Sequence, residues 1–335
     1  MIMNRRNVLK RGAAFGLIGT AGSPSFAQAT HNLKIGTNVQ TNHSIYVRLS
    51  EAADVIRAET DGKVNVRVFP NGQLGSDTDM LSQVRSGGID MLTAPGVVLA
   101  NLVPMASLNS VGFAFHDYAA VWKAMDGPMG AYMRTQIQKA GLVVADRIWD
   151  NGFRHITSLK PITDPGQLAG MKIRVPVSPV LLSIFKSLGA APTPINFNEL
   201  YSALQTKVVE GQENPLTLIN NSKLYEVQKY CAMTGHSWDG FWLLANPRSM
   251  NGLAAPLRET VMKHLNAAAL KQRADSEKLA VSLETDLTAR GMTFNRVDPA
   301  PFREALRRGK FYEEWRGKFG EEAWAQLEGA VGKLA

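Results

Sequence analysis

Short runs of alternating apolar residues recur along the first hundred residues, separated by longer segments with helical spacing. The runs at 33–38, 64–69 and 89–94 are typical of strands. Residues 45–56 and 77–85 place apolar side chains every three or four positions, which predicts amphipathic helices. This alternation of strand and helix predicts a mainly parallel sheet covered by helices.

The alternation begins again in the second half of the chain. The strands predicted there are 142–146, 171–175, 208–210 and 241–244, and the helices are 178–188 and 197–206. No Ser/Gly-rich linker and no internal repeat separates the halves. This favours two α/β domains joined by several close chain crossings and a hinge.

The longest uninterrupted element is predicted from Pro256 to Arg290. After Pro256 it contains neither glycine nor proline, its apolar residues form a stripe, and Gly291 supplies the end. At 1.5 Å per residue such a helix is about 50 Å long, which exceeds the width of a small domain. We therefore expect it to run across both domains.

The N-terminus has the pattern of an export signal. Arg5 and Arg6 begin a basic segment, a glycine-rich apolar run follows, and Ala27-Gln28-Ala29 offers small residues for cleavage. The apolar run is too short for a membrane anchor, which needs about 20 strongly apolar residues. We predict that residues 1–29 are a cleaved signal, of the twin-arginine or the general secretory kind, and that the mature protein lies in the periplasm.

Removing this segment lowers the formal net charge from +8 to +4, so nucleic acid is not an expected partner. The basic and aromatic residues between 302 and 319 are interspersed with acids, and they predict an amphipathic helix with a solvated basic face. Cys231 is the only cysteine, so no intrachain disulfide can form, and we expect it to be buried.

Sequence signatures of enzymes are missing. The mature segment contains no G-x-S-x-G, no P-loop and no G-x-G-x-x-G after a strand. The six histidines include no pair at metal-ligand spacing. Although many active sites leave no local trace, the pattern favours binding over catalysis, with no cofactor and no metal.

Arg174 is a candidate for holding a carboxylate. In Lys172-Ile173-Arg174-Val175, the two apolar residues face one side and the two cations the other. Pro176 then ends the strand, so Arg174 lies at its carboxyl end, where α/β sheets form ligand crevices. A guanidinium can bind a carboxylate there through two charge-assisted hydrogen bonds. The alternative, which this segment alone favours, is a solvated or salt-bridged arginine.

Arg154 and Asn214 allow two interpretations each. Arg154 follows the turn-like segment 149–152, which suits either a pocket wall or a plain loop. Asn214 is predicted in a loop closed by Pro215, where its amide can donate to a ligand or satisfy backbone groups.

Taken together, these segments resemble the solute-binding proteins of TRAP (tripartite ATP-independent periplasmic) transporters, of the C4-dicarboxylate type. The resemblance covers nearly the whole mature chain. It is carried by Phe69-Pro70-Asn71-Gly72-Gln73-Leu74-Gly75, Asn151-Gly152-Phe153-Arg154, Met171-Lys172-Ile173-Arg174-Val175-Pro176, Pro194-Ile195-Asn196-Phe197 and Gly211-Gln212-Glu213-Asn214-Pro215.

The resemblance implies roles for particular residues. Arg174 matches the arginine that pairs with the ligand carboxylate in this family, and Arg154 matches one that assists. Pro95 stands where sialic-acid-binding members carry a glutamate, which argues against sialic acid. The other residues implied for the pocket are Asn38, Phe197, Asn214, Trp149, Trp238 and Asp239.

The resemblance also implies a two-lobed periplasmic binding protein fold, with a hinge and a long helix spanning both lobes. We expect lobe I to comprise residues 30–151 and 240–279, and lobe II residues 152–239 and 280–335. A monomer of this kind closes on a small organic acid and docks on the membrane subunits of a TRAP transporter, without catalysis. The alternatives are an exported α/β enzyme and a ligand-sensing lobe of a receptor. Dicarboxylates, sugar acids, hydroxy or keto acids and aromatic acids all remain open as ligands.

Overall fold

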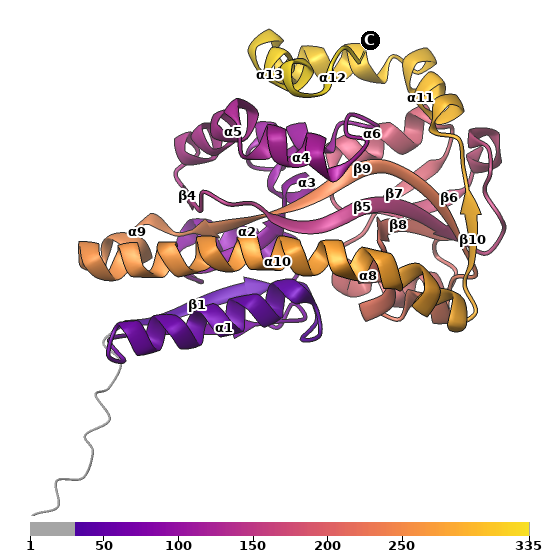
Figure 1. Cartoon of the computed structure of the whole chain (residues 1–335). Helices are drawn as coiled ribbons and strands as arrows, with labels where there is room; N and C mark the ends of the chain where they lie inside the picture. The colour runs from indigo at the N-terminus through magenta and orange to yellow at the C-terminus, as the bar shows by residue number, and fades with distance from the viewer. Residues whose placement is uncertain (1–30, 335) are drawn as a thin grey trace, which may run out of the picture.

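The computed structural model describes residues 31–334, which form one ten-stranded sheet with helices on both faces (Figure 1). The predicted export signal lies outside these residues. The strands are β1 His31–Thr37, β2 Val64–Phe69, β3 Met91–Pro95, β4 Val143–Val144, β5 Trp149–Ser158, β6 Lys172–Val175, β7 Ala191–Pro194, β8 Gly211–Pro215, β9 Tyr230–Ala245 and β10 Thr293–Arg296.

The helices follow the alternation predicted from the sequence. They are α1 Ser44–Glu59, α2 Asp77–Ser86, α3 Gly96–Leu99, α4 Tyr118–Met125, α5 Pro128–Lys139, α6 Pro179–Ser187, α7 Leu200–Gln205, α8 Leu216–Asn221, α9 Pro247–Asn251, α10 Ala255–Ala289, α11 Pro299–Arg308, α12 Phe311–Phe319 and α13 Glu321–Val331. Short 3-10 helices cover Pro104–Ser110, Pro165–Leu168, Phe197–Glu199 and Leu224–Glu226.

Two long strands join two groups of short parallel strands. The strand order is β2-β1-β3-β9-β5-β8-β6-β7, with β10 and β4 pairing to β9. The C-terminal end of β9 is antiparallel to β3, and β9 also runs antiparallel to β5, which in turn is antiparallel to β8. Because β5 and β9 serve both groups, the chain crosses between the halves without a flexible linker, as predicted.

Helix α10 is the third crossing. Its 35 residues correspond to about 50 Å, and Figure 1 shows it running across the whole molecule beside α1. Val261 and Leu265 pack into one core with β1 and α1, whereas Leu283 and Leu287 pack into another with α7 and α8. The long helix that contacts both halves is therefore confirmed.

Several sequence-based boundaries were wrong. Residues 208–210, predicted as a strand, form a turn, and the strand is β8 immediately after it, so Asn214 lies in a strand rather than a loop. The turn-like segment 149–152 is the start of β5. The predicted strand 142–146 shortens to β4, and 241–244 is only the end of the longer β9.

The C-terminal aromatic residues form two helices instead of one. Lys310, with φ 55°, separates α11 from α12, and Phe311, Tyr312 and Trp315 are buried. Helix α12 contacts α6, and α13 packs on α4 and α5 (Figure 1). Cys231 is buried, as predicted. Within residues 31–334, no helix is long and apolar enough to cross a membrane.

Candidate ligand-binding site

The carboxyl ends of parallel strands from both halves meet at one cavity, as expected for an α/β sheet. Asn38 follows β1, Pro95 ends β3, Arg174 lies near the end of β6 and Asn214 near the end of β8. All four line this cavity, which we call the inner cavity. Its other lining residues are Asp77, Val98, Arg154, Pro176, Phe197, Leu218, Asp239 and Phe241. Its volume is only about 10 Å³, room for about one water molecule.

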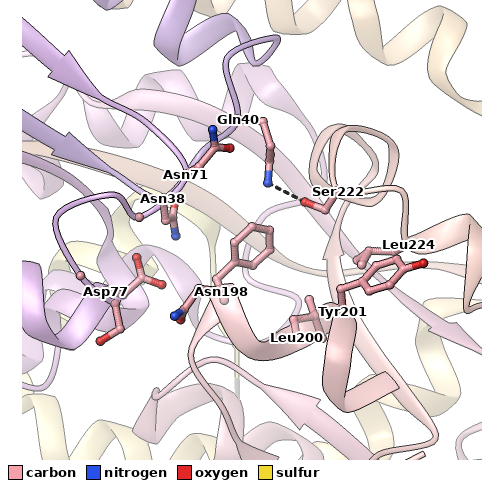
Figure 2. A pocket seen from close by; sticks show the side chains of 13 residues that line it. Asn38, Gln40, Asn71, Asp77, Asn198, Leu200, Tyr201, Ser222 and Leu224 are labelled. Atoms are coloured by element: carbon pink, nitrogen blue, oxygen red, sulfur yellow. Dashed lines mark hydrogen bonds between the residues drawn. The ribbon is translucent and has the colours of Figure 1, made fainter. Parts of the chain in front are cut away.

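A wider outer cavity of about 270 Å³ shares Asn38, Asp77 and Phe197 with the inner one. Figure 2 shows that its walls come from two parts of the chain. Asn38, Gln40, Asn71 and Asp77 belong to the N-terminal half, and Asn198, Leu200, Tyr201, Ser222 and Leu224 to the later elements. The two cavities together form a cleft between the halves of the sheet, narrow at its base.

Arg174 lies at the base of the cleft. Its side chain is 1% exposed, and its Nε donates to the carbonyl of Ile195 at 2.8 Å. Its guanidinium carbon is 5.9 Å from the ring centroid of Phe197. Among residues 31–334, no carboxylate lies within 4.0 Å of its nitrogens, and burial lowers the pKa of Arg174 to about 10. This environment is neither solvated nor salt-bridged, so Arg174 is a buried cation that can accept an anionic ligand.

Arg154 has the opposite environment. Its Nε donates to Glu213 at 2.5 Å and one terminal nitrogen donates to Asp239 at 2.7 Å. The other terminal nitrogen donates to Glu213 and, at 3.1 Å, to Oδ1 of Asn214. Burial acts to lower the pKa of Arg154, but the two carboxylates more than offset it and the pKa is raised. Arg154 therefore holds Asp239 and Asn214 in place along the cavity wall.

A hydrogen-bonded network continues behind Arg154. Glu213 contacts Nε2 of His236 at 3.0 Å. Asn151 donates to Asp239 at 2.7 Å and contacts Nε2 of His43 at 3.0 Å. Burial lowers the pKa of His43 to about 4, so its imidazole is neutral at physiological pH. The network links the start of α1 to the cleft.

Asp77 was missed by the sequence analysis. It is the first residue of α2 and 4% exposed, and its Oδ1 has no hydrogen-bond partner among residues 31–334. Burial raises the pKa of Asp77, while the amide of Asn38 and the charge of Arg174 lower it. The position of α2 was the available signal: a helix that follows β2 begins at the same edge of the sheet as Arg174.

The structure brings six of the eight predicted site residues together. Arg174, Arg154, Asn214, Phe197, Asn38 and Asp239 all line the inner cavity. Trp149 and Trp238 line neither cavity. Trp149 packs in the core beside α1, and Trp238 donates from Nε1 to Asp150 at 2.9 Å in a different core. In residues 31–334 no three His, Cys, Asp or Glu side chains are grouped as a metal site requires.

A buried arginine with no carboxylate within 4.0 Å in the described part of the chain, at the base of a cleft between two α/β halves, is typical of a protein that binds a small anionic molecule. Residues 35–314 match the family described as bacterial extracellular solute-binding protein, family 7. The chain belongs to this family, which confirms the resemblance read from the sequence.

Known relatives are similar in sequence over most of the chain. A solute-binding protein of Roseobacter denitrificans is 34% identical over 290 residues, which are 86% of this chain and 88% of that protein. An uncharacterized protein of Sinorhizobium fredii is also 34% identical, over 284 residues that make up 84% of this chain and 51% of that longer protein.

Solved structures share the fold. A TRAP periplasmic solute-binding protein from Polaromonas, bound to D-erythronate, is 30% identical with a TM-score of 0.85 and covers 89% of this chain and 98% of that one. Another from Sulfurospirillum deleyianum, with bound succinate, is 27% identical with a TM-score of 0.86 and covers 90% and 100%. The two-lobed, TRAP-type α/β fold is therefore confirmed.

Proposed function

We propose that this protein captures a small organic carboxylate in the cleft and delivers it to the membrane subunits of a TRAP transporter, without catalysis. The observation that carries the proposal is the burial of Arg174 with no carboxylate of residues 31–334 within 4.0 Å. The acids bound by the Polaromonas and Sulfurospirillum proteins support it. We further propose that the protein acts as a monomer outside the cytoplasm.

Closure of the two lobes provides the mechanism. With lobe I as 30–151 and 240–279, and lobe II as 152–239 and 280–335, Arg174 belongs to lobe II while Asn38 and Asp77 belong to lobe I. A ligand that bridges both lobes favours the closed form by its greater affinity for that form. Its carboxylate makes bidentate, charge-assisted hydrogen bonds to Arg174, which compensate the cost of burying that cation.

Arg174→Ala tests the proposal. A thermal-shift screen of organic acids first identifies ligands, because binding raises the apparent stability. Removing a buried, charge-assisted contact costs about 2–5 kcal/mol, so calorimetry should show affinity falling roughly 30-fold to several-thousand-fold.

Lys172→Ala is the matched control, because it removes an exposed cation from the same strand. It should bind the acid as the unchanged protein does. Equal affinity in the Arg174 variant contradicts the assignment of this site. Conversion of the bound acid to a product contradicts a function limited to binding and favours the exported enzyme.

A further inference from the structure

The hydrogen-bonding groups of the cleft are unequally distributed between acceptors and donors. Oδ1 of Asp77, Oδ1 of Asp239 and Oε1 of Gln40 are buried and have no hydrogen-bond partner within residues 31–334. Asp77 and Asp239 line the inner cavity, and Asp77 and Gln40 the outer one. An ionised carboxylate only accepts hydrogen bonds, and a buried acceptor without a donor is costly. The cleft therefore complements a molecule that carries several donors.

The charges of the cleft match one carboxylate and leave no cation for a second. Within residues 31–334, Arg154 and Arg174 are the only basic side chains that line the two cavities. Arg154 is already paired with Glu213 and Asp239. A second carboxylate on the ligand would lie near Asp77, and like charges repel strongly in a buried site.

The apolar walls set the size and shape of the ligand. Phe197, Leu200 and Leu224 are the large apolar residues that line the described walls of the outer cavity. The outer volume of about 270 Å³ lies just below the usual range of small-molecule sites, roughly 300–1,000 Å³.

We infer that the ligand is a small monocarboxylate carrying several hydroxyl groups. Its carboxylate binds Arg174, and its hydroxyls donate to Asp77, Asp239 and the amide oxygen of Gln40. This assignment rests on the proposed function and narrows it. A dicarboxylate would find no second cation in the cleft. The keto oxygen of a keto acid accepts hydrogen bonds and would face other acceptors. An aromatic acid has too few hydrogen-bond donors for these acceptors.

A matched series of acids tests the assignment on the mature protein. At the four-carbon length the series contains butanoate, butanedioate and both trihydroxybutanoate diastereomers. At the six-carbon length it contains hexanoate, hexanedioate, gluconate and galactonate. Calorimetry at neutral pH should show a hydroxylated monocarboxylate binding at least about tenfold more tightly than the simple acid and the dicarboxylate of equal length, since two or more net hydrogen bonds are gained.

Asp77→Asn tests the role of the negative charge. The substitution keeps the shape of the side chain and removes its repulsion of a second ligand carboxylate. The ratio of the affinity for the hydroxylated acid to that for the dicarboxylate should therefore fall about tenfold, equivalent to roughly 1.4 kcal/mol. Asp79→Asn is the control, because Asp79 lies in the same first turn of α2 but is exposed and bonded to Ser76. Its preference should equal that of the unchanged protein.

The experiments distinguish failure of the ligand assignment from failure of the proposed function. A dicarboxylate that binds as tightly as any hydroxylated acid, or an Asp77→Asn preference equal to the original, overturns the assignment and leaves a carboxylate-binding protein. The same holds if only a keto or aromatic acid from the wider screen binds. If no carboxylate of any kind binds, the proposed function itself fails.

Discussion

Two buried arginines, on β5 and β6 with β8 between them, have opposite electrostatic surroundings. Arg154 is held by Glu213 and Asp239, whereas Arg174 has no protein carboxylate within 4.0 Å among residues 31–334. Breaking a buried ion pair by removing one partner is strongly destabilising, because the remaining charge stays buried. An isolated buried cation instead lowers stability until an anion binds. We therefore expect Arg154 to contribute to the stability of the fold and Arg174 to bind the ligand.

Methionine substitutions separate these roles, because methionine keeps much of the side-chain volume. Arg154→Met should lower the free energy of unfolding by about 3–5 kcal/mol, since Glu213 and Asp239 lose their cation. Arg174→Met should change it by less than about 1 kcal/mol or raise it, because an uncompensated buried charge is removed. Urea unfolding without ligand measures both. Equal destabilisation by the two substitutions is the contradicting outcome.

The sequence identified Arg174 by its place after an alternating strand and before Pro176. It could not show that Arg154 is neutralised, because the two acids responsible lie 59 and 85 residues further along the chain. Asp77 was missed for a related reason. An acid in the first turn of a helix is ordinary there, and only the tertiary fold reveals that this one is buried in the cleft.

Among the elements, β5 and β9 determine how the halves are joined. Their pairing shifts register between Asp150 and Gly152, and again between Arg154 and Ile156. Such bulges bend a strand locally. Gln272, midway along α10, bonds the backbone N–H and carbonyl of Asp150 beside the first shift. Asp150 of β5 pairs with Gly240 of β9 and bonds to Gln272 of α10, so the three crossings are connected around Asp150. We expect the hinge there.

We expect Asp150 to make the stability of the protein depend on pH. Burial raises the pKa of Asp150 from 3.8 to about 7, against hydrogen bonds from Trp238 and Tyr118 that lower it. Because the pKa of Asp150 is higher in the folded protein than in the unfolded chain, its protonated form stabilises the fold. This contribution is complete below about pH 4 and is lost as the pH rises toward 7. Relative to Asp150→Asn, the unchanged protein should lose about 4 kcal/mol of unfolding free energy between pH 4 and 8. Parallel stability curves for the two proteins contradict this expectation.

Periodicity predicted the elements whose side chains differ between two faces, such as α1, β2 and α10. It failed for β8, whose sequence Gly211-Gln212-Glu213-Asn214-Pro215 contains no alternation and no β-branched residue. All five residues are buried, and Gln212 and Glu213 bond to Thr157 on β5 and His236 on β9. Since those partners are distant in sequence, local pattern placed the strand three residues too early. The start of β5 was missed for the same reason.

At the scale of the whole molecule, direct hydrogen bonds connect the two predicted lobes. Gln40 donates to Ser222 at 2.8 Å across the outer cavity, and Asn42 donates to Asn221 at 3.3 Å (Figure 2 shows the first). Asn101 donates to the carbonyl of Val177 at 2.6 Å. We expect these bonds to break when the lobes separate. They should then stabilise the closed form together with the ligand, each by its own free energy.

Asn101→Ala tests this contribution, because Asn101 itself lines neither cavity; the substitution also removes a bond of 2.9 Å to the carbonyl of Val98 within lobe I. One net hydrogen bond is worth about 0.5–1.5 kcal/mol, so affinity should fall roughly 2- to 12-fold. The change should appear as faster dissociation in stopped-flow measurements, with the radius of gyration of the ligand-free protein increased in X-ray scattering. Asn65→Ala is the control, because it removes a 3.1 Å bond to Asn32 within one lobe and should leave both quantities unchanged. If the two variants behave alike, the bonds between the lobes do not govern closure, and the ligand alone determines the closed state.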